Sequence, residues 1–290
     1  MADLILDNEP VIRLGFFAGV LILVAAWEAA RPRRARSFSR WLRWPSNFAI
    51  VALNTVVLRL IFPAAAIGMA FYAEEHGWGL FNAFEVPAAL AVIASVLALD
   101  LIIYLQHVMV HAVPVLWRLH RMHHADLDID VTTGARFHPI EILLSMVIKL
   151  AAVAVLGAPA VAVVIFEVLL NATAMFNHGN LRLPLGLDRV LRLVVVTPDM
   201  HRVHHSIVPA ETNSNFGFNL PWWDRLLGTY RAQPAAGHEA MTIGIEQFRA
   251  PKYLRLDRLL VQPFLGEVGD YPINRRGATG KEADPGRGPT

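Results

Sequence analysis

The feature that most constrains the fold is a succession of long apolar segments. They cover residues 11–30, 48–72, 86–110 and 140–176, and 55% of the chain is hydrophobic while only 17% is charged. A helix of about 20 apolar residues crosses the hydrocarbon layer of a bilayer, and Gly157, Ala158 and Pro159 divide the last segment into two short helices. We therefore predict an all-α fold, namely a polytopic membrane helical bundle of three full spans plus a two-helix hairpin, with a cytosolic helical cap.

Charges between the apolar segments predict the orientation. Residues 31–43 contain six arginines and no acidic residue, whereas residues 74–85 are acidic and aromatic. Because basic loops are retained on the cytoplasmic side, we expect the N-terminus outside, and the arginine loop, the histidine motifs and the C-terminus in the cytoplasm. This interpretation of the arginines is favoured over nucleic-acid binding, and no nucleic-acid partner is expected.

The predicted organisation is a single integral-membrane domain over residues 1–265. Residues 1–85 supply the N-terminal transmembrane helices, and residues 86–231 form a core with the histidine motifs. Residues 266–290 are rich in glycine, proline and charge, which predicts a disordered tail. The chain has no cysteine, which excludes disulfides, thiolate zinc sites and iron–sulfur clusters.

Histidines form three clusters in this apolar chain. Residues three and four apart share a face of a helix, so each His-x-x-His-His triplet can aim three imidazoles at one point, and a preceding pair adds two more. Imidazole is a common ligand of zinc, iron, copper and nickel, and the sequence does not choose among them. The eight residues are His107, His111, His120, His123, His124, His201, His204 and His205.

Two further histidines flank the 140–176 hairpin. His138 precedes it and His178 follows it, so both are expected at the level of the clusters. The ten candidates suit two metal ions with four or five ligands each, whereas His76 and His238 are interpreted as bystanders. Asp100, seven residues before His107, either holds a ligand imidazole by its second N–H or only caps or pairs locally, and the sequence leaves both roles open.

A membrane protein with such histidine clusters could be a metal-dependent enzyme or a metal transporter. Transporters place polar ligands near the middle of the membrane, whereas these histidines fall at the ends of the apolar segments and beyond, which favours an enzyme.

Glu167 and Asn171, one turn apart within the hairpin, could line a lipid cavity or pair inside the bundle, and the sequence does not separate these two roles.

The motifs resemble the fatty acid hydroxylase/sterol desaturase superfamily of integral-membrane di-iron oxygenases. The matching segments are HVMVH at 107–111, HRMHH at 120–124, FHP at 137–139, NHGNLRLP at 177–184, TPDMHRVHH at 197–205 and NFGFNLPWWDRLLGTY at 215–230. The resemblance implies metal-ligand roles for the eight clustered histidines and, with them, for His178 and His138.

What this resemblance implies for function is specific. Two iron ions at the cytosolic membrane face would activate O2 and hydroxylate a C–H bond of a lipid such as a fatty acyl chain or a sterol; desaturation by the same site is the alternative. The expected partners are a lipid substrate in the bilayer and a separate electron donor, of the ferredoxin or cytochrome b5 type with its reductase.

Overall fold

The computed structural model describes residues 2–275, and within this range the chain contains helices and two isolated β-bridges but no strand. This confirms the predicted all-α class. Five segments are long and apolar enough to cross a membrane: Glu9–Ala30, Arg40–Ala83, Ala88–Ala112, Pro139–Leu156 and Ala160–Asn177. The long helices are α2 (Glu9–Ala30), α3 (Arg40–Ile61), α6 (Ala88–Ala112), α8 (Pro139–Leu156) and α9 (Ala160–Asn177), with α1 (Ala2–Asp7), α4 (Ala65–Glu75) and α5 (Leu80–Ala83) between them.

The second apolar segment is broken rather than only kinked. Helix α3 begins after Ser39, whose side chain accepts a hydrogen bond from the backbone N–H of Trp41, and it ends at Ile61. Pro63 follows, and proline has no N–H and collides with the carbonyl one turn earlier. The chain therefore restarts as a separate helix, α4.

The expected hairpin is formed by α8 and α9. Gly157 ends α8 in the left-handed conformation, with φ of 66°, which glycine adopts without the steric cost of a side chain. A Cβ atom at this position would lie 2.6 Å from the carbonyl oxygen of Trp78. The turn of the hairpin is thus packed directly against the segment between α4 and α5.

Helix α9 is the central helix of the bundle, packed against α2, α4 and α6. Its buried residues include Val163 and Phe166, which join Leu99 of α6 and Met146 of α8 in the main hydrophobic core. The remaining α-helices of the described chain are short and are joined by loops and 3-10 turns: α7 (Pro114–His124), α10 (Leu185–Leu191), α11 (Pro198–His204), α12 (Pro209–Thr212), α13 (Trp222–Leu226), α14 (Gly237–Ala240) and α15 (Leu256–Val261).

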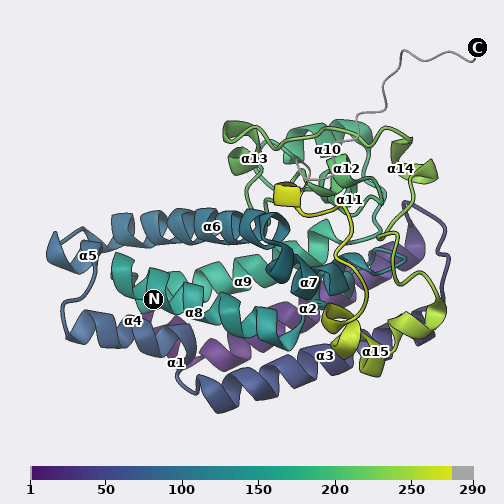
Figure 1. Ribbon diagram of the computed structural model, residues 1–290. Coiled ribbons are helices and arrows are strands. Elements are labelled where there is room, and N and C mark those ends of the chain that lie inside the picture. Colours follow the sequence, from purple (N-terminus) through teal and green to yellow (C-terminus); the bar gives the residue numbers. More distant parts are fainter. Residues whose placement is uncertain (1, 276–290) are drawn as a thin grey trace, which may run out of the picture.

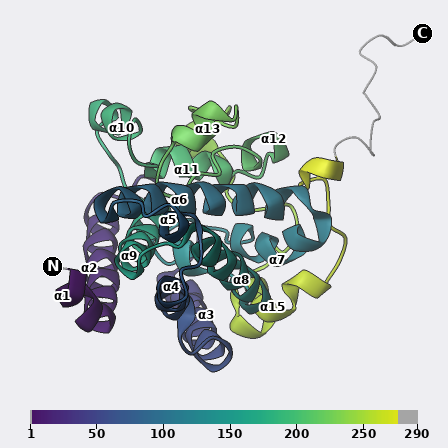
Figure 2. The ribbon, with the colours of Figure 1, turned by 90° about the vertical axis from the view of Figure 1, so that its left-hand side faces the viewer.

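The short helices are gathered on one side of the bundle. In two views at right angles, α10, α11, α12 and α13 lie above α6, while α3 lies on the opposite side of the molecule (Figures 1 and 2). Helix α7 follows directly on the end of α6 and packs against it. The predicted cap is therefore present, and it covers the ends of α6 and α9 that lead into the histidine motifs.

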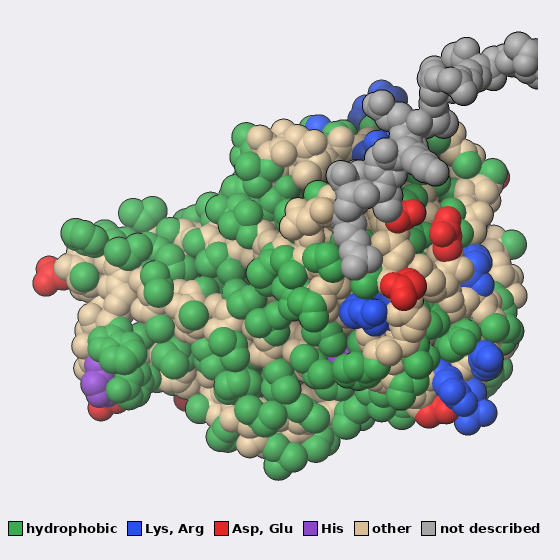
Figure 3. All heavy atoms as spheres, in the orientation of Figure 1, with side chains coloured by type: hydrophobic (Ala, Val, Ile, Leu, Met, Phe, Trp, Pro, Cys, Tyr) green, Lys and Arg blue, Asp and Glu red, His purple; other side chains and the backbone are tan. Residues whose placement is uncertain are grey.

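Hydrophobic side chains cover the surface of the long helices. Figure 3 shows them over the left and centre of the molecule, whereas charged side chains gather toward the right, where α15 lies. Leu14 and Ile22 of α2 are each 68% exposed, and Leu60 of α3 is 78% exposed. Apolar surface of this extent is stable in contact with lipid chains, and the long helices satisfy their backbone polar groups internally.

The first residues of the predicted tail, 266–275, pack on the cap. Val268 and Tyr271 are buried in a small core with Trp117 and Ile245. The Tyr271 hydroxyl donates to the carbonyl of Ile207 at 2.9 Å. This anchoring aromatic residue explains why residues 266–275 pack on the cap. The remainder of the predicted tail, residues 276–290, lies outside the described residues.

Candidate metal centre

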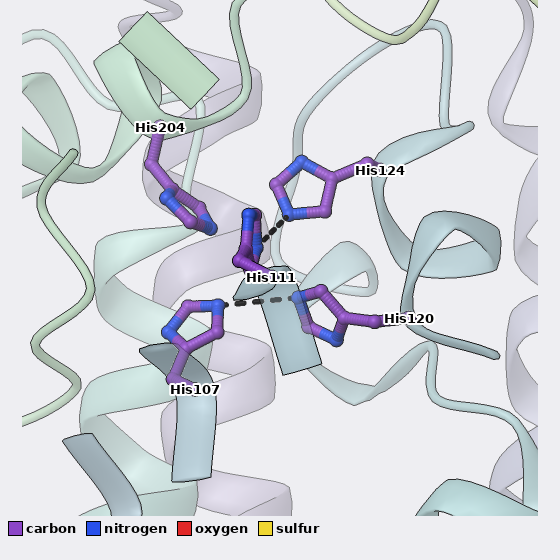
Figure 4. Close-up of side chains that lie close together, drawn as sticks. All are labelled: His107, His111, His120, His124 and His204. Atoms are coloured by element: carbon purple, nitrogen blue, oxygen red, sulfur yellow. Dashed lines mark hydrogen bonds between the residues drawn. The ribbon is translucent and has the colours of Figure 1, made fainter. Parts of the chain in front are cut away.

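Nine of the ten candidate histidines lie together where the ends of α6 and α9 meet the cap, in two adjacent groups. Each is exposed by 3% or less, and the facing nitrogen atoms within a group lie within 4.8 Å of one another. Figure 4 shows rings from α6, α7 and α11 converging in the larger group. That group contains His107, His111, His120, His124 and His204; the smaller contains His123, His178, His201 and His205.

The two triplets share their histidines between the groups, contrary to the expectation that each would aim at one point. His120 and His124 of α7 join the five-histidine group, but His123 joins the other. Successive residues on a helix are rotated by about 100°, so adjacent histidines point in different directions. His204 and His205 separate in the same way.

In the five-histidine group, hydrogen bonds fix which ring nitrogen carries the proton. Nδ1 of His107 lies 2.7 Å from the carbonyl oxygen of Phe216, and Nδ1 of His120 lies 2.7 Å from Oε1 of Glu141. Both partners only accept, so each Nδ1 must donate. In a neutral ring, Nε2 then carries a lone pair and no hydrogen.

The same arrangement holds at three more rings. His111 Nδ1 lies 3.0 Å from Oδ1 of Asn213, whose Nδ2 donates to the carbonyl of Tyr271 and thereby fixes the amide orientation. Nδ1 of His204 faces the carbonyl of Ser214 at 2.7 Å, and Nδ1 of His178 faces the carbonyl of Ala174 at 2.7 Å. In the neutral form of each of these five rings, Nε2 therefore carries the lone pair.

These lone pairs point at one another. The Nε2 atoms of His107 and His120 are 3.1 Å apart, as are those of His111 and His124 (Figure 4). His178 Nε2 makes 3.1 Å approaches to His123 and His201 in the smaller group. Lone pairs of His107 and His120 repel at this distance unless a cation binds them both. The donor set therefore fits a bound metal ion.

The protonation states support the same conclusion. Burial, followed by the neighbouring imidazoles, holds the pKa of His123, His124 and His205 well below the usual range. Neutral imidazole is the form that binds metal ions. Within residues 2–275, Nε2 of His204 and both ring nitrogens of His205 are buried without a hydrogen-bond partner. Buried polar atoms normally have partners, and a metal ion would supply the missing ones.

His138, the tenth candidate, is not part of either group. It caps the N-terminus of α8, where its Nδ1 accepts from the backbone N–H of Ile140 at 3.2 Å. Its Nε2 faces the carbonyl of Leu260 at 3.2 Å. Both ring nitrogens of His138 thus contact backbone groups rather than the other candidate histidines.

Asp100 does not hold His107. Its Oδ2 accepts from Trp223 Nε1 at 2.8 Å and from the backbone N–H of Leu220 at 3.3 Å. The carboxylate that does contact a cluster histidine is Glu141, which the sequence analysis missed. A signal was available, since Glu141 lies in the first turn of α8, three residues after His138.

A buried ion-pair network supports the segment between α7 and α8. Arg43 of α3 donates to both oxygens of Asp126 at 2.7 Å and also to Asp130, and Arg136 lies 3.1 Å from Asp126. Burial alone would raise the pKa of Asp126, but the two guanidinium groups bring it to about 2. This network anchors the chain two residues after His124.

Glu167 and Asn171, the polar pair of the hairpin, make their contacts inside the helical bundle. Glu167 Oε1 accepts from Lys149 at 2.6 Å, and Oε2 lies 2.9 Å from the guanidinium of Arg13 in α2. The Asn171 side chain donates to the Glu167 carbonyl at 2.8 Å. Of the two roles left open by the sequence, the structure therefore shows pairing inside the bundle.

The fold and the site together define an integral-membrane helical protein with buried polyhistidine clusters that can hold metal. Residues 92–229 match the family model described as fatty acid hydroxylase. The chain belongs to the fatty acid hydroxylase superfamily, as the motifs indicated. No solved structure matches the chain.

Relatives of the chain are lipid-modifying enzymes by name. It is 33% identical over 206 residues to ornithine lipid hydroxylase OlsE of Rhizobium tropici, covering 70% of this chain and 59% of that protein. It is 27% identical over 189 residues to alkylglycerol monooxygenase of Xenopus tropicalis, covering 63% and 41%. The chain thus spans about half the length of the relatives it matches.

Four substitutions should differ in how much metal the purified protein binds. His178→Ala removes a ring whose Nε2 faces two others, so we expect loss of metal from the four-histidine group. Glu141→Gln should weaken metal binding by about 10–100-fold, the usual effect of losing a carboxylate behind a ligand imidazole. His138→Asn should keep the wild-type metal content, because asparagine still caps the N-terminus of α8. Asp100→Asn should keep it too, because the asparagine side-chain oxygen can still accept the hydrogen bond from Trp223.

The measurement is elemental analysis of purified, folded protein, with metal affinity obtained by competition with a chelator. Full occupancy in His178→Ala, or metal loss in His138→Asn that equals the loss in His178→Ala, would contradict the nine-histidine assignment.

Proposed function

We propose that this protein is a membrane-bound non-haem di-iron monooxygenase that uses O2 to hydroxylate a C–H bond of a lipid. The observation that carries the proposal is the arrangement of nine buried histidines in groups of five and four, with one ring nitrogen of each facing the others of its group. The nitrogen-only ligand set accepts several transition metals, and iron is proposed because the chain belongs to the fatty acid hydroxylase superfamily.

Iron bound by the two groups would supply the O2 activation and the oxidising power for cleavage of an unactivated C–H bond. The protein's own residues hold the ligands in place. Backbone carbonyls of Phe216, Ser214 and Ala174 fix the orientation and tautomer of three rings. Glu141 does the same for His120 with a charged acceptor, which makes that imidazole a stronger donor to a cation.

Aromatic side chains surround the histidines and exclude water. Phe137 stacks on His123 with ring centroids 4.5 Å apart, Phe218 lies 5.0 Å from His107, and fully buried Trp117 lies 4.8 Å from His111. An apolar shell suits the approach of a hydrocarbon chain. It also protects a strongly oxidising site from side reactions with solvent.

The proposed reaction combines one lipid C–H bond, O2, two electrons and two protons to give an alcohol and water. Hydroxylation is favoured over desaturation because the relatives are named as a hydroxylase and a monooxygenase. The two electrons are proposed to come from a separate donor, of the ferredoxin or cytochrome b5 type with its reductase. The lipid is proposed to enter from the bilayer, between the apolar helices.

The histidine groups and the C-terminal region are proposed to face the cytoplasm. Arg31 and Arg36 are exposed in the loop between α2 and α3, and Arg33 of the same loop contacts Asp199 of α11 in the cap. The acidic segment, residues 74–85, lies instead beside the turn between α8 and α9. Four of the six arginines at positions 31–43, two in this loop and two at the start of α3, have side-chain partners within the protein, so these arginines serve packing as well as orientation.

Cysteine labelling tests this orientation cleanly, because the chain contains no cysteine. Glu75→Cys should react with a membrane-impermeant maleimide in intact cells. Arg36→Cys, also exposed, should react only after the membrane is permeabilised. The reverse pattern would overturn the proposed topology.

Lipid analysis tests the activity. Cells that express the wild-type chain should contain a lipid with one added oxygen atom, and the atom should carry the label when cells grow under isotopically labelled O2. His205→Ala should abolish this product, since both ring nitrogens of His205 lie in the cluster without other partners, while His138→Asn should retain it. Loss of two hydrogens without oxygen gain would instead establish a desaturase, and an unlabelled oxygen would exclude an O2-dependent monooxygenase.

A further inference from the structure

A cavity of about 540 Å³ lies apart from the histidine groups, at the end of α2. Three arginines and four apolar residues line it, and no step of the proposed reaction uses it. The lining residues are Trp27, Arg31, Arg33, Arg182, Leu183, Pro184 and Leu185.

Backbone pairing brings the arginines of this cavity together. The segments around Pro32 and Leu181 form an antiparallel bridge. Arg33 donates its backbone N–H to the carbonyl of Asn180 at 2.9 Å, and Arg182 donates to the carbonyl of Arg31 at 3.2 Å. The arrangement is therefore fixed by the fold rather than by flexible side chains alone.

One exposed carboxylate already shows what the arginines bind. Oε1 of Glu239 accepts from Arg33 at 2.8 Å and from Arg182 at 3.2 Å, although its side chain is 69% exposed. Asp199 also lies 3.3 Å from Arg33 but is shared with Arg202. The lining thus has more positive than negative charge, and a single surface carboxylate occupies a position that another anionic oxygen can take.

The apolar side of the cavity indicates an amphiphile. Trp27 belongs to the last turn of the membrane-spanning helix α2, and tryptophan favours the level of the lipid headgroups. Leu185 at the start of α10 is 72% exposed beside the arginines. Guanidinium groups next to apolar surface at this level match a phosphate joined to acyl chains.

We propose that this cavity, hereafter the arginine cavity, binds the phosphate of an anionic phospholipid from the adjoining leaflet. Arg31, Arg33 and Arg182 would bind the phosphate in place of Glu239, and Trp27 and Leu185 would contact the start of the acyl chains. A zwitterionic headgroup fits less well, because its ammonium group is repelled by the arginines. The site is independent of the histidine groups and of their activity.

The test is calorimetric titration of the full chain in detergent with dioctanoyl phosphatidylglycerol. Saturable binding is expected, and Arg31→Gln should weaken it by about tenfold, the loss expected for one hydrogen bond between charged groups. Arg31→Gln combined with Arg182→Gln should weaken it further. Glu239→Gln should strengthen binding, because it removes the competing carboxylate.

Arg36→Gln is the matched control, since Arg36 is an exposed arginine of the same loop that does not line the cavity. It should bind like the wild type, and all variants should retain the wild-type melting temperature. Equal binding of dioctanoyl phosphatidylcholine would overturn the proposal, as would equal weakening by Arg36→Gln. Inorganic phosphate alone that bound as tightly would show a simple anion site rather than a lipid site.

Discussion

The close packing of nine buried imidazoles, whose ring nitrogens face one another, governs the arrangement of the cap. Burying polar nitrogen atoms without partners is costly, and here the facing Nε2 atoms have only one another. The fold compensates at the far side of the rings, where carbonyls of Phe216, Ser214 and Ala174 accept the Nδ1 protons. A bound metal ion would supply the remaining interactions, and the stability of the cap would then be linked to occupancy of the site.

Charged networks hold the helices that carry these histidines. Arg43 links α3 to Asp126, just beyond the last histidine of α7, and Glu167 links α9 to Lys149 of α8 and Arg13 of α2. A buried ion pair adds little net stability compared with apolar packing, but loss of one partner leaves an unpaired buried charge. Such pairs therefore fix how the helices lie relative to one another. The close approach of the histidine nitrogens within each group depends on this placement.

The sequence predicted what depends on local pattern. Apolar segment lengths predicted the long helices, and histidine spacing predicted the eight clustered residues. The sequence did not predict that His123 and His204 each join the group that the other two histidines of their own triplet do not. This depends on how α7 and α11 are rotated against each other. His138 and His178 both flank the hairpin, yet only His178 turns inward, since His138 caps α8. Asp100 is bound by Trp223, a partner too distant in sequence to infer.

Mössbauer spectroscopy of protein loaded with iron-57 can count the iron sites of the proposed centre and show whether they are coupled. We expect two irons per chain, each in a nitrogen-rich environment, close enough to form one spin-coupled pair as adjacent groups of five and four histidines would hold them. A single iron per folded chain, or two irons that behave as isolated ions, would contradict this expectation.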